Sequence, residues 1–127
     1  MTELRTALGR VRGLGSAKEG PAHWWAQRLT GVALGPLAIW FGLSAIRLGG
    51  ANHAVFKAWV ADQTNAVLLV LLTVARFHHA YLGVQVVVED YVHTESCKIV
   101  SLVAARFVAI VAAVCCIMAV FRLAFGS

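Results

Sequence analysis

Charged residues are scarce in this 127-residue chain: 11 Lys and Arg together with 6 Asp and Glu make up 13% of it. Soluble proteins carry roughly 25% charged residues, and a globule of this length would have too few here to cover its surface. Apolar residues make up 60% of the sequence. The composition therefore disfavours a soluble enzyme and a disordered tail, and the length is that of a single domain, 1–127.

Cysteine is also rare, with three residues in all, and two of them, Cys115 and Cys116, lie inside an apolar run. An odd count in that setting excludes a secreted disulfide scaffold. The three cysteines have no metal-ligand spacing with a histidine, so we interpret them as small apolar side chains. A glycine-rich dinucleotide fingerprint is absent as well. The sequence therefore has no signature for binding flavin or an iron–sulfur cluster.

Three apolar stretches bounded by charged residues predict transmembrane helices at about 29–48, 64–89 and 98–122. The first contains 18 uncharged residues, which as a helix span about 27 Å, close to the roughly 30 Å hydrocarbon core of a bilayer. Backbone amides in lipid must find their partners locally, which favours helices. We therefore expect an all-α membrane protein with three transmembrane helices.

Basic residues are concentrated before the first stretch, at Arg5, Arg10, Arg12, Lys18 and Arg28. The positive-inside rule then places an N-terminal tail, 1–22, and the loop 89–98 in the cytoplasm. Few basic residues remain for a water-facing patch, so we expect no nucleic-acid partner. Nothing apolar precedes residue 29, so we expect neither a secretory signal nor a transit peptide. These features favour the inner membrane of a bacterium.

Two further patterns have ordinary structural explanations that require no specific function. Trp24, Trp25 and Trp59 fall near the predicted membrane interfaces, where an aromatic belt explains them without a function. Gly31 and Gly35 have the spacing of a helix-contact motif, and the ordinary frequency of glycine in membrane helices explains them equally well.

His79 lies near the middle of the second stretch, ten residues before Glu89, or about 15 Å along a helix. A neutral histidine at that depth has one donor and one acceptor to satisfy, through a neighbouring helix, a water or a metal. Gly83 lies about 40° and Asp90 about 20° from His79 around a helix, so the three share one stripe. A histidine with a glycine one turn away is what a flat haem macrocycle needs; a structural hydrogen bond is the alternative.

Two neighbours of His79 offer other interpretations. His78 is the alternative ligand, but it points about 100° away from the stripe shared with Gly83. Arg76 either snorkels to the outer surface or forms, with His79, the proton relay of a small transporter. The first and third stretches contain no histidine, so a second axial ligand would come from another chain.

Asp90 and Tyr91 end the second stretch at the predicted cytoplasmic edge. A tyrosine there is commonly an interfacial anchor. The functional interpretation is a hydroxyl that donates to a quinone carbonyl, with the adjacent carboxylate orienting it or relaying protons. Quinone reduction consumes two protons, so such a site must communicate with water, as the membrane edge does.

The run His79-Ala80-x-x-Gly83-(x6)-Asp90-Tyr91 resembles the SdhD-type small membrane anchor subunit of succinate dehydrogenase, respiratory complex II. The resemblance implies that His79 is one axial ligand of a b-type haem beside Gly83, and that a sister anchor of the SdhC type supplies the other. It further implies that Tyr91 hydrogen-bonds ubiquinone and that Asp90 supports it. Arg28, at the matching N-terminal position, would approach the quinone or a haem propionate.

Arg106 departs from the family pattern, and either a haem propionate contact or snorkelling towards the cytoplasm accounts for it. The segment Arg28-Leu29-Thr30-Gly31 also matches the sister anchor, but the Asp90–Tyr91 pair is that of the smaller subunit. The resemblance implies an anchor that is not catalytic alone and that works with an iron–sulfur subunit and a flavoprotein subunit. A purely structural anchor and a fumarate reductase anchor without haem ligation are the alternatives.

Overall fold

A computed structural model of the chain describes residues 6–12 and 19–126. Within these ranges all regular structure is helical: α1 (Ala7–Arg12), α2 (Glu19–Arg47), α3 (His53–Ala61), α4 (Gln63–Tyr91) and α5 (Glu95–Phe125). Three of them, α2 over Pro21–Arg47, α4 and α5, are long and apolar enough to cross a membrane. The prediction of an all-α membrane protein with three such helices is confirmed.

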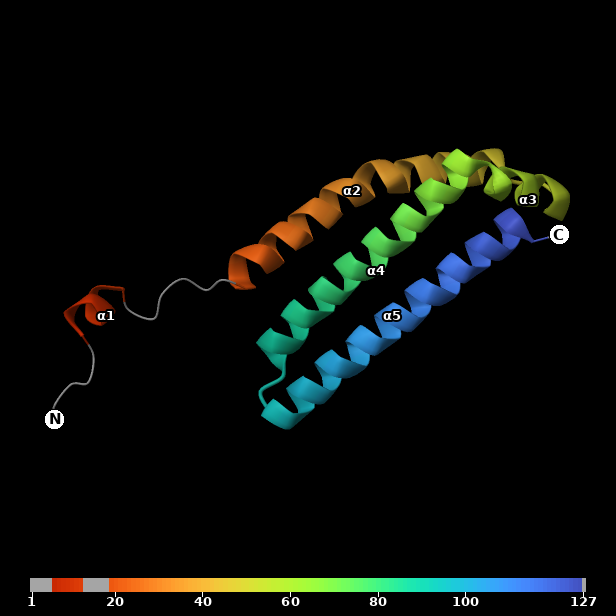
Figure 1. Cartoon of the computed structure of the whole chain (residues 1–127). Coiled ribbons are helices and arrows are strands. Elements are labelled where there is room, and N and C mark those ends of the chain that lie inside the picture. The colour runs from red at the N-terminus through yellow and green to blue at the C-terminus, as the bar shows by residue number, and fades with distance from the viewer. Residues whose placement is uncertain (1–5, 13–18, 127) are drawn as a thin grey trace.

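The first long helix begins earlier than the sequence predicted. It starts at Glu19 rather than near residue 29, because Arg28 marks the edge of the apolar stretch and is itself a good helix former. The expected tail 1–22 therefore includes Thr6, α1 and the first residues of α2, whereas 1–5 and 13–18 lie outside the described residues. Pro36 lies inside α2, where it removes one backbone donor and favours bending; α2 is curved in Figure 1.

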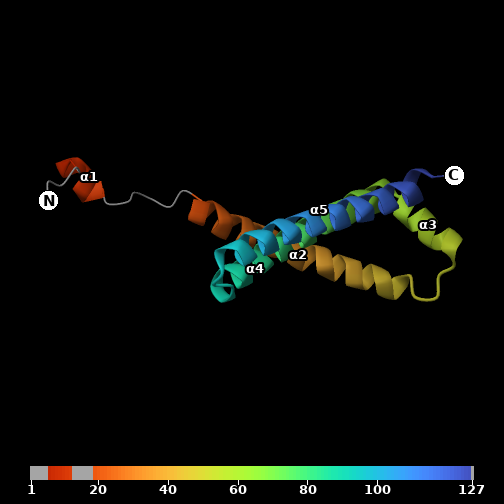
Figure 2. The ribbon, with the colours of Figure 1, turned by 90° about the horizontal axis from the view of Figure 1, so that it is seen from below.

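The three long helices form a layer with α4 in the middle. Helix α4 packs against α5 on one side and α2 on the other, while α2 and α5 do not pack against each other in the described structure. Figure 1 shows the three side by side, each antiparallel to its neighbour. In the view of Figure 2, α2 crosses α4 and separates from it towards Arg47, and α3 lies at that end. The three long helices therefore make two separate interfaces with one another in the described structure, both on α4.

Helix α3 lies between the first two long helices, where the sequence predicted only a loop. The Asn52 side chain caps it by accepting a hydrogen bond of 2.9 Å from the Val55 amide. Trp59 stacks on Trp40 of α2 with 5.7 Å between ring centroids, and Val60 is only 1% exposed. Trp59 thus ties α3 to α2, a packing role beyond an interfacial position. The signal was present in the sequence, since a capping Asn precedes the apolar segment.

Very little of the chain is enclosed by the chain itself. The side chains buried among the described residues are Ser44, Val60, Thr73 and Leu82. Large apolar side chains are exposed along the three long helices, such as Ile39 at 66%, Val108 at 69% and Phe107 at 65%. A layer one helix thick cannot enclose a core, so its faces must meet lipid or other membrane helices.

Candidate functional site

The side chain of His79 lies in the interface between α4 and α2. Its Nδ1 is 3.0 Å from the hydroxyl oxygen of Thr30. A Cβ built on Gly31 would lie 3.4 Å from Cε1 of the His79 ring, so the glycine lets the imidazole lie against the α2 backbone. The ring is half-buried. Of the two glycines with helix-contact spacing, Gly31 therefore meets another helix, whereas Gly35 has no atom within 4 Å of a built Cβ.

The surface of α4 one turn from His79 is bare. A Cβ built on Gly83 would meet no atom within 4 Å. Helix α4 is continuous from Gln63 to Tyr91, so the stripe of His79, Gly83 and Asp90 predicted from helix geometry is present along it. Nε2 of His79 hydrogen-bonds none of the residues that the structure describes. A half-buried imidazole with one engaged nitrogen and open space beside it suits a flat ligand on that face.

Asp90 and Tyr91 lie in the last turn of α4. Tyr91 is about 18 Å along the helix from His79. Both are exposed, Tyr91 by 78%. The neighbouring Glu89 accepts a hydrogen bond of 3.0 Å from Gln85, whereas Asp90 and Tyr91 hydrogen-bond no described side chain. Their phenol and carboxylate are therefore accessible to a ligand or to another subunit.

Arg28 is not close to Tyr91. It is exposed, and its guanidinium carbon lies 5.0 Å from the centre of the Trp24 ring on the same helix. Because Thr30 meets His79 and the two helices are antiparallel, Arg28 is about 3 Å from the level of His79 and about 15 Å from that of Tyr91 along the helix axes. Arg28 was expected to approach either the quinone or a haem propionate. The structure places it nearer to the level of His79 than to that of Tyr91.

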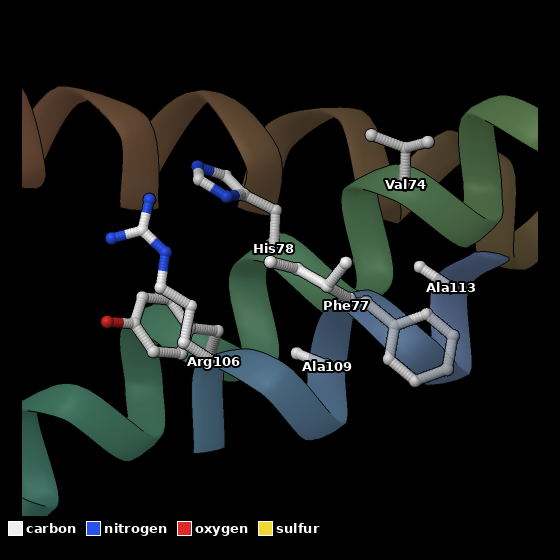
Figure 3. Close-up of a pocket in the computed structure, with 8 residues that line it drawn as sticks. Val74, Phe77, His78, Arg106, Ala109 and Ala113 are labelled. Atoms are coloured by element: carbon white, nitrogen blue, oxygen red, sulfur yellow. The ribbon is translucent and has the colours of Figure 1, made fainter. Parts of the chain in front are cut away.

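Arg106 and His78 line a separate pocket of about 240 Å³ between α4 and α5 (Figure 3). The guanidinium carbon of Arg106 lies 5.9 Å from the centre of the Tyr81 ring. His78 is exposed and projects from α4 in the same direction as Arg106 from α5 in this view. The structure therefore groups Arg106 with the alternative ligand His78 rather than with His79.

Arg76 is exposed, and its guanidinium carbon lies 4.5 Å from the centre of the Phe77 ring. It makes no hydrogen bond to His79, whose engaged nitrogen faces α2. The pair that a proton-relay transporter would need is therefore not assembled in this chain, since Arg76 packs on the ring next to it.

The face of α2 that carries Thr30 has two further polar side chains, which were not predicted as functional residues from the sequence. His23, Gln27 and Thr30 follow one another at helical spacing, and Nε2 of His23 and Oε1 of Gln27 are buried without a hydrogen-bond partner. His23 belongs to α2, although it lies outside the stretch predicted for the first helix. It is about 10 Å from the level of Thr30, so it does not meet the His79 ring. The i, i+4, i+7 spacing was the signal for this polar face.

Comparisons with known proteins agree with the family that the sequence resembles. The family described as succinate dehydrogenase/fumarate reductase transmembrane subunit matches residues 2–120. A succinate dehydrogenase hydrophobic membrane anchor subunit of Rickettsia bellii is 27% identical over 119 residues, covering 94% of this chain and 95% of the relative. The corresponding subunit of Rickettsia felis is 33% identical over 104 residues, covering 80% and 85%. A succinate dehydrogenase membrane anchor subunit of Reclinomonas americana is 30% identical over 96 residues, covering 73% and 80%.

No solved structure matches the chain significantly. The family match covers nearly the whole chain, including all three long helices up to residue 120. The relatives share its length as well as its sequence, since the alignments cover most of both partners. The chain therefore belongs to the transmembrane subunits of succinate dehydrogenase and fumarate reductase, and within them to the hydrophobic membrane anchors of succinate dehydrogenase.

Proposed function

We propose that this membrane anchor subunit co-binds a b-type haem through His79 and forms part of the site where ubiquinone is reduced. The observation that carries the proposal is the His79 ring. It is half-buried against α2, one nitrogen is held by Thr30, the other hydrogen-bonds no described residue, and Gly83 leaves open space on the same stripe. These residues fit a haem, because an axial imidazole needs a free nitrogen and a bare helix surface beside it.

When bound, the haem would supply one-electron chemistry beside the quinone site. The residues of this chain that would hold it are His79 and the surface at Gly83. Arg28 is exposed and lies near the level of His79 on α2, the helix that the His79 ring faces, so it is the better placed of the two proposed propionate partners. Arg106 lies with His78, and its contact with the cofactor stays a prediction. Among the described residues no cluster of three or more His, Cys, Asp or Glu side chains could hold a metal ion. A second ligand to the haem iron would therefore come from outside the described residues.

The quinone end of the proposal rests on Tyr91 and Asp90. The phenol of Tyr91 would donate a hydrogen bond to a quinone carbonyl, which orients the ring and stabilises negative charge on that oxygen as it is reduced. Asp90, on the adjacent residue, would pass protons from water to the site. Both side chains are exposed at the end of α4, where the two protons required for each quinone can arrive.

The same proposal includes the partners and the orientation. The anchor would pair with a sister anchor that supplies the second axial histidine, and would dock an iron–sulfur subunit and a flavoprotein subunit on the side where α4 ends and α5 begins. That side carries Asp90 and Tyr91 and faces the cytoplasm by the positive-inside rule. We place the complex in the inner membrane of a bacterium, with the N-terminus in the cytoplasm.

A reduced-minus-oxidised absorption spectrum of the co-purified complex tests the haem directly. We expect a b-type signal that succinate can reduce, together with succinate-dependent reduction of ubiquinone. An intact four-subunit complex without such a signal would contradict haem binding and favour the alternative of a purely structural anchor. Turnover that is faster with fumarate and a low-potential quinol than with succinate and ubiquinone would favour the fumarate reductase alternative.

Replacing Gly83 with Leu should lower haem occupancy about 10-fold or more, because overfilling a packed interface costs about 1–3 kcal/mol. A side chain at that position starts into open space in the chain itself, since no atom lies within 4 Å of a built Cβ. Gly42→Leu is the matched control: it also meets nothing within 4 Å but lies about 18 Å along α2 from Thr30. Haem per complex is measured by pyridine haemochrome assay, and equal occupancy in the two variants would contradict a haem at Gly83.

A further inference from the structure

The hydroxyl of Thr30 makes three close polar contacts. Its oxygen lies 2.7 Å from the Ala26 carbonyl oxygen and 3.1 Å from that of Gln27, both on the preceding turn of α2. The third contact, 3.0 Å, is to Nδ1 of His79 on α4. A hydroxyl has a single hydrogen to donate and two lone pairs. The way this hydrogen is used therefore decides what His79 must do.

The carbonyl oxygens can only accept. The Thr30 hydrogen must lie between its oxygen and the carbonyl at 2.7 Å, because two oxygen lone pairs facing each other at that distance would repel. The lone pairs of Thr30 are then left for the histidine. Nδ1 of His79 must donate, and it carries the proton. The chain of bonds runs from the His79 N–H to the Thr30 oxygen, and from the Thr30 O–H to the backbone of α2.

A neutral imidazole has one N–H, so a protonated Nδ1 leaves the lone pair on Nε2. Nε2 hydrogen-bonds no residue in the described part of the chain. Thr30 therefore presents the histidine in the one neutral form whose outer nitrogen can bind a metal. Gly31 has no side chain, so the edge of the His79 ring can lie close to the α2 backbone. A Cβ built on Gly31 would be only 3.4 Å from Cε1 of that ring.

We propose that Thr30 is a positioning residue for the haem ligand. It fixes the tautomer and direction of the His79 ring and, because its own hydrogen is donated to the α2 carbonyl, it stays a hydrogen-bond acceptor for Nδ1. The inference rests on the proposed function, because it takes His79 as the axial ligand. Histidines that bind metals commonly donate their other N–H to an acceptor, and losing that acceptor costs 10–100-fold in metal affinity or activity. A hydrogen bond donated by the other N–H of a ligating imidazole increases its electron donation to the iron and stabilises ferric over ferrous haem, so Thr30 would lower the haem midpoint potential.

The test compares Thr30→Val and Thr30→Ser in the assembled complex. Valine keeps the shape and removes the acceptor, so we expect the haem midpoint potential to rise and haem affinity to fall about 10–100-fold. Serine keeps the hydroxyl and should restore both values. The readouts are a potentiometric titration of the b-type absorption and haem per complex, measured besides turnover. If Thr30→Val blocks assembly, Thr30→Ala removes the hydroxyl without adding a methyl group and takes its place.

Thr73→Val is the matched control. The Thr73 hydroxyl donates to the Leu69 carbonyl at 2.8 Å, the same backbone bond within α4, without touching a histidine. It should leave the haem potential at the wild-type value. An equal shift in Thr73→Val, a serine variant that behaves like valine, or a wild-type potential and occupancy in Thr30→Val would each overturn the inference while leaving the His79 ligand in place. Wild-type haem content in His79→Ala would instead overturn the proposed function.

Discussion

The His79→Ala variant of the assembled complex is expected to lose its low-spin b-type haem signal, whereas His78→Ala is expected to keep it. The two histidines are adjacent in sequence, but the structure separates their surroundings. The His79 ring lies between α4 and α2 with Nδ1 on Thr30, and His78 lines the pocket between α4 and α5. Removing an axial ligand should cost more than the 10–100-fold in affinity that follows loss of a supporting partner.

The pair is measured by reduced-minus-oxidised spectra at equal protein concentration, with co-purification of the subunits as the check on assembly. Should His79→Ala fail to assemble, His79→Gly with added imidazole supplies the missing ligand in the same space, and recovery of the signal identifies the position. The opposite pattern, loss in His78→Ala alone, would move the ligand to the pocket that contains Arg106. A wild-type signal in both variants would mean that this chain does not bind the iron.

Replacing Tyr91 with Phe is expected to slow succinate-dependent ubiquinone reduction on the order of 10²-fold, the lower end of what a positioned proton donor contributes. The phenyl ring keeps the shape, and the side chain is 78% exposed within the chain, so folding is not expected to change. The haem spectrum should stay as in the wild type, because Tyr91 lies about 18 Å along α4 from His79. Steady-state turnover with ubiquinone is the measurement.

Two controls isolate the quinone step. Succinate oxidation by a soluble dye that accepts electrons before the membrane should be unaffected by Tyr91→Phe. Tyr81→Phe removes the only other tyrosine hydroxyl of the chain, one that lies beside Arg106 in the α4–α5 pocket, and should leave turnover near the wild-type rate. Unchanged turnover in Tyr91→Phe would reduce that residue to an interfacial anchor.

The sequence was sufficient for the three long helices, because charged residues bounding apolar stretches report where a chain enters and leaves the membrane. The same charged residues predicted the ends of the helices less accurately, because a polarity boundary need not be a helix end. Arg28 marks a polarity boundary, but it does not interrupt hydrogen bonding, and α2 continues back to Glu19. Helix α3 was missed because its nine residues are too short to span, although Asn52 supplied a capping signal.

For the candidate site, the features that lie on one helix could be predicted from the sequence, whereas the contacts between helices could not. The stripe of His79, Gly83 and Asp90 follows from the geometry of one helix and could be predicted from spacing alone. The contact between His79 and Thr30 joins residues 49 positions apart, and it depends on which faces of α2 and α4 meet. No periodicity in a single sequence fixes that choice. For the same reason spacing could not show that Arg28 lies near the level of His79, or that Arg106 shares a pocket with His78.

An experimental density map of the purified complex tests the central claim most directly. We expect an iron porphyrin bonded to Nε2 of His79, with Nδ1 of the same ring on the Thr30 hydroxyl and the macrocycle lying against Gly83. A map in which the His79 ring faces lipid chains, or in which the iron is bonded to His78 or to no residue of this subunit, would contradict it.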